Sequence, residues 1–597
     1  MQTNNVITPQ QSGTLHGLFL ERVARSPDKI AYRYFMQDAW CELTWREVHN
    51  QVARWQSALV KQGLQRGDRV AIMLRNCPQW VMFDQAAMSL GLVVVPLYIV
   101  DRPDNIAFIV NNANIKVLLL ETAEQWQSLC TVGDQLANVQ CFVSIDNVPN
   151  NGDARLHSMA DFLPDTAQLQ TAPPCEMGEL ASIIYTSGTT GKPKGVMLSH
   201  GNMLSNAYAT LEIFTVREED VFISFLPLSH TFERTLGYYL TVMTGSVVAF
   251  ARSIPQLSED LQTIRPTLMI SVPRIYERVY GAIHTKLDEG SPLKRKLFKL
   301  AVDVGWARFE EQQGRGGWKP SFLLWPILKK LVAQKIMDKL GGHLRAAFSG
   351  GAALAPEISR LFIGLGLPII QGYGLTETSP VITGNHEDNN FPHSAGLPIP
   401  DVQVRLGERN ELQVKGPNVM LGYWNNPEAT QAMIDADGWL STGDIARISE
   451  TGHVYITGRI KEIIVMSNGE KVPPNDMELA ILQDKLFDQA MIFGEARPYL
   501  VALVVLNPEA WLQFCKELGM NANESATLAD SRVQDKVLER IAVGVKAFPG
   551  YAKINRVLLL QEPWSIDNGL LTPTLKLKRP HVVGRFEKQI KQLYEGH

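Results

Sequence analysis

A chain of 597 residues is too long for one ordinary domain, so the sequence predicts at least two domains. Its formal net charge of −4 provides no basic excess to neutralise phosphates, which argues against a nucleic acid as partner. The six cysteines are scattered without a Cys-x-x-Cys pair. This spacing argues against a disulfide framework or a zinc site and favours a reducing, cytoplasmic compartment.

Apolar runs alternate with helical patterns along the first 400 residues. The N-terminus, 1–14, is polar and lacks the apolar core of a signal peptide. The apolar stretch 86–100 is shorter than the roughly 20 residues of a membrane span, and it predicts a helix end, a turn at Gly91 and a strand over 92–95. Further strands are expected at 70–74, 117–120, 247–250 and 268–271. This alternation predicts an α/β protein with mostly parallel sheets.

The most informative segment runs from Tyr185 to Gly195 and follows a strand-like stretch at 180–184. It reads Tyr-Thr-Ser-Gly-Thr-Thr-Gly-Lys-Pro-Lys-Gly. Glycines expose backbone N–H groups, hydroxyls donate further hydrogen bonds and lysines neutralise charge, so this composition favours a phosphate-binding loop over a polar surface turn. It is not a Walker A loop, because Pro193 follows Gly191-Lys192.

Five further motifs follow in order, at 349–352, 373–378, 441–444, 458–462 and 572–579. Together with the loop, they resemble the signature of the adenylate-forming superfamily, which includes acyl-CoA synthetases, luciferases and peptide-synthetase adenylation domains. The resemblance implies a large N-terminal domain over 1–458, made of stacked mixed sheets with helices and a β-rich subdomain over about 395–458. A hinge at 459–461 and a small, mobile α+β lid domain over 462–597 would follow.

The resemblance also implies a two-step reaction that uses ATP, Mg²⁺ and coenzyme A. A carboxylate attacks the α-phosphorus of ATP and expels pyrophosphate; a thiol then attacks the acyl-adenylate and releases AMP. Glu377 is expected to hold the metal with help from Thr186. Lys576 is expected to be the catalytic lysine, with Lys578 as the alternative, and Lys461 to be the hinge residue.

The residues expected at the nucleotide come from all of these motifs. Adenine should lie between Tyr373 and the backbone of 350–352, Asp444 should bind the ribose hydroxyls, and Arg459 should contact the ribose or α-phosphate. The full set is Thr186, Ser187, Gly188, Thr189, Thr190, Gly191, Lys194, Gly350, Gly351, Ala352, Gln371, Gly372, Tyr373, Gly374, Leu375, Thr376, Asp444 and Arg459.

The acyl group is expected to contact His230, Phe232 and Gly374. The segment 226–234 resembles the long-chain version of the acyl entrance, and acetyl-specific relatives place a Trp at the position of Gly374. These features favour a long-chain fatty acid:CoA ligase. Two alternatives stay open, namely a fatty acyl-AMP ligase that loads an acyl carrier protein and a non-catalytic nucleotide- or lipid-binding homologue.

Cationic and aromatic residues alternate in 291–340, which resembles an insertion of long-chain fatty acyl-CoA synthetases. An amphipathic helical pair packed on the core is the favoured interpretation, and peripheral contact with the inner face of a membrane is the second. A monomer and a homodimer are both compatible with the sequence.

Overall fold

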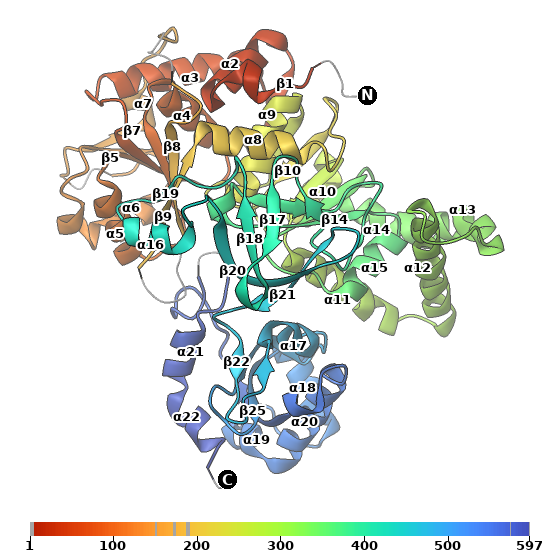
Figure 1. The fold of residues 1–597 in the computed structure, drawn as a ribbon. Coiled ribbons are helices and arrows are strands. Elements are labelled where there is room, and N and C mark those ends of the chain that lie inside the picture. The colour runs from red at the N-terminus through yellow and green to blue at the C-terminus, as the bar shows by residue number, and fades with distance from the viewer. Residues whose placement is uncertain (1–4, 150–151, 171–174, 187–191, 573–574, 596–597) are drawn as a thin grey trace.

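The computed structural model describes residues 5–149, 152–170, 175–186, 192–572 and 575–595. Sheets of nine, eight and four strands, up to residue 459, form the body that we call the large part (Figure 1). A three-stranded sheet belongs to the C-terminal body from residue 464 onward, which we call the small part. The small part has its own apolar core, which extends from Ile464 to Leu559. The predicted fold class, mixed sheets with helices plus a small C-terminal domain, is therefore confirmed.

The nine-stranded sheet is parallel in its centre and antiparallel at both edges. The prediction of mixed, mostly parallel sheets is therefore confirmed here: neighbouring strands pair in parallel from β14 to β1, and β16, β15 and β2 add antiparallel pairs at the edges. Its order is β16 (Leu397–Pro398), β15 (Val381–Gly384), β14 (Ile369–Gly374), β13 (Ala346–Ser349), β12 (Leu268–Ser271), β10 (Val221–Ser224), β11 (Val247–Phe250), β1 (Ile30–Met36) and β2 (Ala39–Thr44).

The other sheets place the phosphate-loop region and the β-rich region. The eight-stranded order is β19 (Gly422–Tyr423), β9 (Lys194–Ser199), β8 (Leu180–Thr186), β4 (Val93–Pro96), β3 (Arg69–Met73), β5 (Ile115–Leu120), β6 (Cys141–Ser144) and β7 (Leu156–Ser158). The four-stranded sheet contains β17 (Gln403–Leu406), β18 (Glu411–Lys415), β20 (Leu440–Ile448) and β21 (Val454–Arg459). Since β16 and β19 pair with the larger sheets, the β-rich region is tied to both of them.

The small part contains β24 (Phe487–Phe493), β25 (Leu500–Leu506) and β26 (Ile554–Leu560), preceded by the hairpin of β22 (Ile464–Val465) and β23 (Lys471–Val472). Helices of this part are α17 (Pro474–Ile481), α18 (Pro508–Glu517), α19 (Ser525–Ala529), α20 (Ser531–Gly544), α21 (Arg579–Arg585) and α22 (Glu587–Gln592).

Helices of the large part mostly cover the sheets, and several of them begin with a side chain that caps the first turn. A capping box between Thr44 and Glu47, for example, begins α3. The helix α4 is buried along nearly its whole length, as its apolar sequence requires. None of the described helices is long and apolar enough to cross a membrane. The helices are α1 (Pro9–Ser12), α2 (Leu15–Arg25), α3 (Trp45–Val60), α4 (Pro78–Ser89), α5 (Pro103–Ala113), α6 (Ala123–Cys130), α7 (Met159–Phe162), α8 (His200–Thr210), α9 (Leu240–Thr244), α10 (Leu257–Ile264), α11 (Pro273–Asp288), α12 (Pro292–Gln312), α13 (Trp325–Leu328), α14 (Gln334–Met337), α15 (Pro356–Gly364) and α16 (Pro427–Met433).

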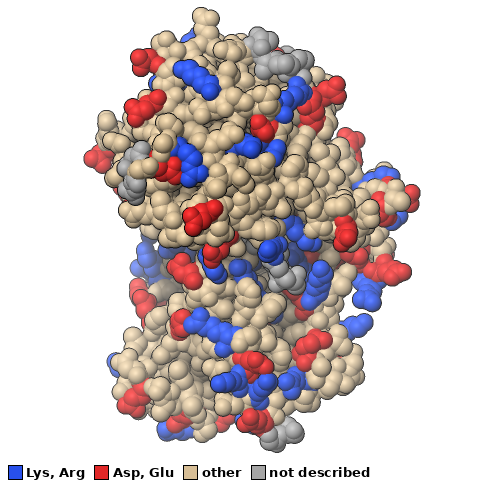
Figure 2. Space-filling view, turned by 90° about the vertical axis from the view of Figure 1, so that its left-hand side faces the viewer, with Lys and Arg blue, Asp and Glu red and all other residues tan. Residues whose placement is uncertain are grey.

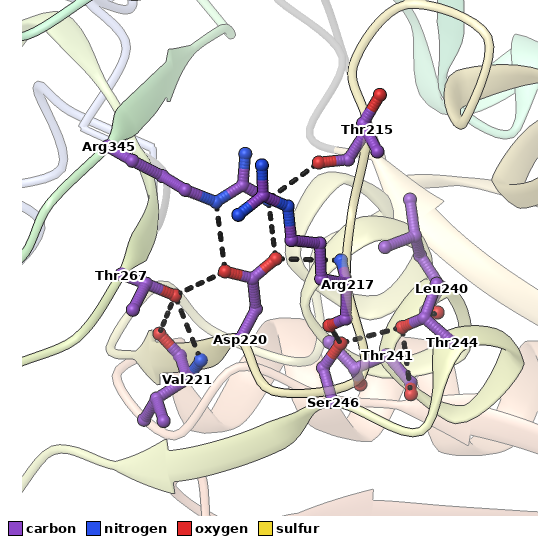
Figure 3. A network of polar contacts seen from close by, with 10 residues as sticks. All are labelled: Thr215, Arg217, Asp220, Val221, Leu240, Thr241, Thr244, Ser246, Thr267 and Arg345. Carbon is purple, nitrogen blue, oxygen red and sulfur yellow. Dashed lines mark hydrogen bonds and ion pairs between the residues drawn. The ribbon is translucent and has the colours of Figure 1, made fainter. Parts of the chain in front are cut away.

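A buried carboxylate, that of Asp220, holds together the amino ends of three neighbouring strands of the nine-stranded sheet, β10, β12 and β13 (Figure 3). Asp220 accepts hydrogen bonds from Arg345 Nε (2.9 Å), Thr267 Oγ1 (2.7 Å) and the Arg217 backbone N–H (2.7 Å). Burial opposes its charge, but the hydrogen bonds from Arg345, Thr267 and Arg217 prevail and lower the pKa of Asp220. Asp220 therefore stabilises the fold above its ordinary pKa, and this contribution is lost as the pH falls through the lowered value.

Replacing Asp220 with Asn should lower the free energy of unfolding by about 3 kcal/mol at pH 7, because Arg345 then keeps its charge without a counter-charge. Urea unfolding at pH 7 and at more acidic pH would measure this effect, and the difference from wild type should shrink on acidification. Asp28→Asn removes an exposed partner of Arg46 and should change stability by less than about 1 kcal/mol. Equal losses in the two variants would contradict this account.

Candidate active site

The carboxyl ends of β13 and β14 bring the predicted adenine and acyl residues together. A side chain built at Gly350 would place its Cβ 2.9 Å from the Phe232 ring, so this ring packs directly on the Gly350 backbone. Gln371 is buried and has protein partners: its Oε1 accepts from the Leu354 N–H (3.3 Å) and its Nε2 donates to the Pro392 carbonyl. The Gln371 side chain thus links β14 to the loop that follows Gly350.

Three residues predicted to bind the nucleoside form one hydrogen-bonded group. Asp444 on β20 faces Arg459 on β21, and Arg459 Nε donates to Asp444 Oδ1 at 2.8 Å. Tyr373 Oη donates to the second oxygen, Oδ2, at 2.5 Å. Asp444 is only 2% exposed, so these two donors compensate for its burial. Burial opposes the charge of Arg459, but Asp444 and Glu462 raise the pKa of Arg459.

The two predicted metal residues, Glu377 and Thr186, are connected through β19: its Tyr423 contacts Glu377, and β19 pairs with β9, next to Thr186 on β8. Tyr423 on β19 donates from Oη to Glu377 Oε1 at 2.8 Å, and Lys194 Nζ lies 5.0 Å from the centre of the Tyr423 ring. Lys194 in turn pairs with Thr186 across β9 and β8. One carboxylate and one hydroxyl beside a phosphate loop fit Mg²⁺, which takes few protein ligands and completes its shell with phosphate oxygens and water. The predicted loop residues Ser187, Gly188, Thr189, Thr190 and Gly191 lie outside the described residues.

The C-terminal part contributes a lysine to the same region. Loss of hydration beside the surrounding protein, and then the positive charge of Arg459, lower the pKa of Lys576, while the carboxylates of Asp444 and Glu377 oppose this shift. Lys576 keeps an exposed surface, as expected for a side chain in an open cleft. Its backbone N–H donates to Thr572 Oγ1 at 3.0 Å. Figure 2 shows the surface hollowed between the two parts, with Lys and Arg side chains around the hollow.

Two further contacts bear on this arrangement of the two parts. An ion pair joins Lys485 of the small part to Asp288 at the end of α11, at 2.6 Å. Arg579, three residues after Lys576, pairs with Glu478 on α17 at 2.5 Å and so anchors the C-terminal segment within the small part. Lys578 directly precedes α21, and its backbone N–H donates to the Leu570 carbonyl.

The profile of the family described as AMP-binding enzyme matches residues 19–424, and the profile of its C-terminal domain matches residues 461–597. The chain belongs to the AMP-binding enzyme family. Two relatives from Arabidopsis thaliana differ in their named acceptors. Long chain acyl-CoA synthetase 6, peroxisomal, is 34% identical over 90% of this chain and 79% of the relative. The chloroplastic long-chain-fatty-acid–[acyl-carrier-protein] ligase AEE15 is 28% identical over 95% of this chain and 85% of the relative.

Solved structures agree with the fold of this AMP-binding enzyme. The adenylation domain of a carboxylate reductase from Mycobacterium chelonae superposes with a TM-score of 0.75 at 22% identity, over 99% of this chain and 94% of that chain. At this identity the likeness concerns the fold alone.

Two of the predicted acyl residues of this AMP-binding enzyme have different surroundings. His230 is half-buried, and burial followed by the charge of Lys576 lowers its pKa to about 4, so His230 is neutral at pH 7. Gly374, however, has no room for any side chain, because its Cβ would lie 1.9 Å from the Pro380 carbonyl oxygen. A Trp at position 374 would therefore have to displace Pro380, directly before β15, before it could close an acyl pocket. Whether Gly374 contacts the acyl group stays a prediction.

Gly374→Ala should accordingly lower the free energy of unfolding by about 1–3 kcal/mol through overpacking, and should reduce turnover of every fatty acid without changing the preferred chain length. Urea unfolding and a chain-length series would measure the two effects. Gly281→Ala on α11 is a suitable control, since its added methyl meets no atom within 4 Å. A shift toward short acids in Gly374→Ala would show instead that the acyl chain passes this position.

Two features of the AMP-binding enzyme site were missed in the sequence. Tyr423 lies in a two-residue strand, and only its pairing with β9 reveals that it reaches Glu377. A small apolar cavity lies in the core between β10, β12, β13, α8 and α9. Its lining is Thr210, Phe214, Val216, Phe222, Leu236, Leu240, Ile270 and Phe348. These residues are spread over 139 positions from 210 to 348, so no sequence motif could have grouped them.

Proposed function

We propose that this chain is a long-chain fatty acid:CoA ligase that forms acyl-AMP from ATP and then acyl-CoA, releasing pyrophosphate and AMP. The observation that carries the proposal is the position of Lys576, which comes from the C-terminal part and lies within electrostatic reach of Asp444, Arg459 and Glu377. A cation there meets the place where two anions, the carboxylate and the α-phosphate, must approach each other.

Each remaining group has a role in the first step. Asp444 would accept hydrogen bonds from the ribose hydroxyls, with Arg459 beside it, and adenine would lie against Tyr373 and the Gly350 backbone. Glu377 and Thr186 would hold Mg²⁺, which neutralises the phosphates when bound. The side chain of Lys576 would neutralise the fatty acid carboxylate and the α-phosphate as they come together. Holding these partners in line is the main physical task of this step.

The acyl chain would enter beside His230 and Phe232 and extend toward the small apolar cavity that Leu236, Leu240 and Phe348 help to line. Neutral His230 leaves the positive charge at Lys576 as the one that faces the carboxylate. Each methylene buried along this path contributes about 0.8 kcal/mol, which gives a physical basis for preferring long chains. The cavity is small, so side chains such as Leu236 and Phe348 must move to admit a long chain.

A substrate panel tests the proposal and its alternatives. Purified protein is incubated with ATP, Mg²⁺ and fatty acids from acetate to stearate, with either CoA or an acyl carrier protein as acceptor. Release of pyrophosphate together with acyl-CoA from palmitate is the expected result. Accumulation of acyl-AMP until the carrier protein is added would establish the acyl-AMP ligase instead, and no pyrophosphate with any acid would leave only a binding role.

The setting of the reaction is part of the proposal. We infer a cytoplasmic enzyme, monomeric or homodimeric, that contacts the inner face of a membrane peripherally through residues 291–340. The interleaved cationic and aromatic side chains of this region support the contact.

A further inference from the structure

The region 291–340 forms a helical arm that stands away from the sheets at the right of Figure 1, where α12 and α13 are labelled. Its base is fixed, because α12 packs against α15 so closely that Gly305 has no room for a side chain beside the Gly364 carbonyl. The rest of the arm has a small apolar core of its own. Phe322, Trp325, Leu328 and Val332 pack there against Ala301 and Val304 of α12.

The opposite face of the arm carries apolar side chains that nothing in the described structure covers. Leu323, Ile327 and Leu331 are 73%, 60% and 50% exposed, and their spacing of four residues places them in one row along successive helical turns. Trp318, 61% exposed, precedes this row. Single exposed apolar residues are ordinary, but a continuous row marks an interaction surface. We call these three residues, together with Trp318, the apolar row.

The charge around the apolar row has one sign. Residues 312–337 contain no Asp or Glu and have five cationic side chains: Arg315, Lys319, Lys329, Lys330 and Lys335. Arg315 is engaged by Glu310. The other four are exposed, and no ion pair involves them within the described residues. In a protein of net charge −4, this segment is a local cationic surface.

We propose that the apolar row inserts into the interface of a bilayer that contains anionic lipids, while Lys319, Lys329 and Lys330 bind the lipid headgroups. An apolar stripe flanked by lysines fits a bilayer interface, because the acyl region buries the apolar side chains and the anionic headgroups bind the lysines. A second copy of this arm is a poorer partner, because two cationic surfaces would face each other. The inference deepens the peripheral contact of the proposed function by naming the residues and the lipid charge.

Vesicle co-sedimentation tests the inference with three matched variants of the full chain. The first replaces Leu323, Ile327 and Leu331 with Ser, and the second replaces Lys319, Lys329 and Lys330 with Gln. The control, Leu512→Ser with Val543→Ser, changes exposed apolar residues of the C-terminal part. Wild type and control should sediment with phosphatidylcholine vesicles that contain phosphatidylglycerol, and much less with phosphatidylcholine alone. The lysine variant should bind these vesicles on the order of a hundredfold more weakly than wild type. This estimate assigns about 1 kcal/mol to each lysine and about a tenfold loss of affinity to each 1.4 kcal/mol.

The outcomes separate this inference from the ligase proposal, because vesicle binding is measured without substrates. Equal binding by wild type and both arm variants would overturn the inference, as would equal loss in the control. The inference would also be overturned if wild type did not bind vesicles but formed a dimer that the Ser variant abolished in sedimentation velocity. The apolar row would then be a contact between two copies of this chain. Turnover of octanoate, which needs no vesicle, should be unchanged in both arm variants; if no variant or wild type turned over any acid, only the ligase proposal would fail.

Discussion

Replacing Lys576 with Ala should slow formation of acyl-AMP from ATP and palmitate by a factor of about 10² to 10³, the usual loss when one charge-stabilising group is removed from an active site. The reason is local, since Lys576 is the cation that the C-terminal part places beside Asp444, Arg459 and Glu377. Without it, two anions must approach each other with less compensation. Pyrophosphate release in the absence of CoA would measure this step alone.

The matching measurement starts from preformed acyl-adenylate. Because the resemblance implies that the lid turns away for the second step, Lys576→Ala should form the thioester at nearly the wild-type rate. Lys578→Ala is the control, since Lys578 directly precedes α21 and its backbone N–H donates to the Leu570 carbonyl within the small part. Equal loss of both half-reactions in Lys576→Ala would defeat the assignment, and a larger first-step loss in Lys578→Ala would transfer the role.

Lys461→Pro should produce the opposite defect. Proline fixes φ near −65°, and a lid rotation about residue 461 needs that torsion. In the described structure no backbone hydrogen bond from the Lys461 N–H is found, whereas the N–H groups of Glu462 and Ile463 both donate to the Arg459 carbonyl. The substitution should therefore keep the present orientation, with Lys576 in the cleft, and still permit adenylation. Thioester formation from acyl-adenylate and CoA should fall to background.

Lys461→Ala is the control for this variant, because it removes the side chain and leaves the torsion free. It should perform both half-reactions at nearly wild-type rates. If Lys461→Pro transferred the acyl group normally, the rotation would have to occur at a different residue. Small-angle scattering with acyl-AMP, then with CoA, would show separately whether the domain arrangement changes.

The sequence indicated those parts of the fold and site that depend on short contiguous patterns. Apolar runs predicted β3, β5, β11 and β12, because a buried strand must be apolar over its whole length. Asp444 and Arg459 were predicted from separate motifs, and the structure pairs them across two strands. Whether they bind the nucleotide stays a prediction.

The rest depended on pairings that no single segment reveals. Tyr423 reaches Glu377 only because a two-residue strand joins β9, and such a short strand has no periodicity of its own. The lack of space at Gly374 also depends on a distant neighbour in the sequence pattern, since it comes from the Pro380 carbonyl directly before β15. Which strands would pair antiparallel at the edges could not be read for a similar reason, since such pairings are set by turns and not by strand composition.

The pairing of Asp444 with Arg459 determines where this protein can be divided and recombined. Arg459 is the last residue of β21, so it belongs structurally to the large part although it lies two positions before Lys461. Exchanging C-terminal domains between relatives is a natural way to alter acceptor use. A junction placed before Arg459 would import a foreign partner for Asp444 and disturb the large part. A junction after Ile460 would leave that pair native and exchange only the small part.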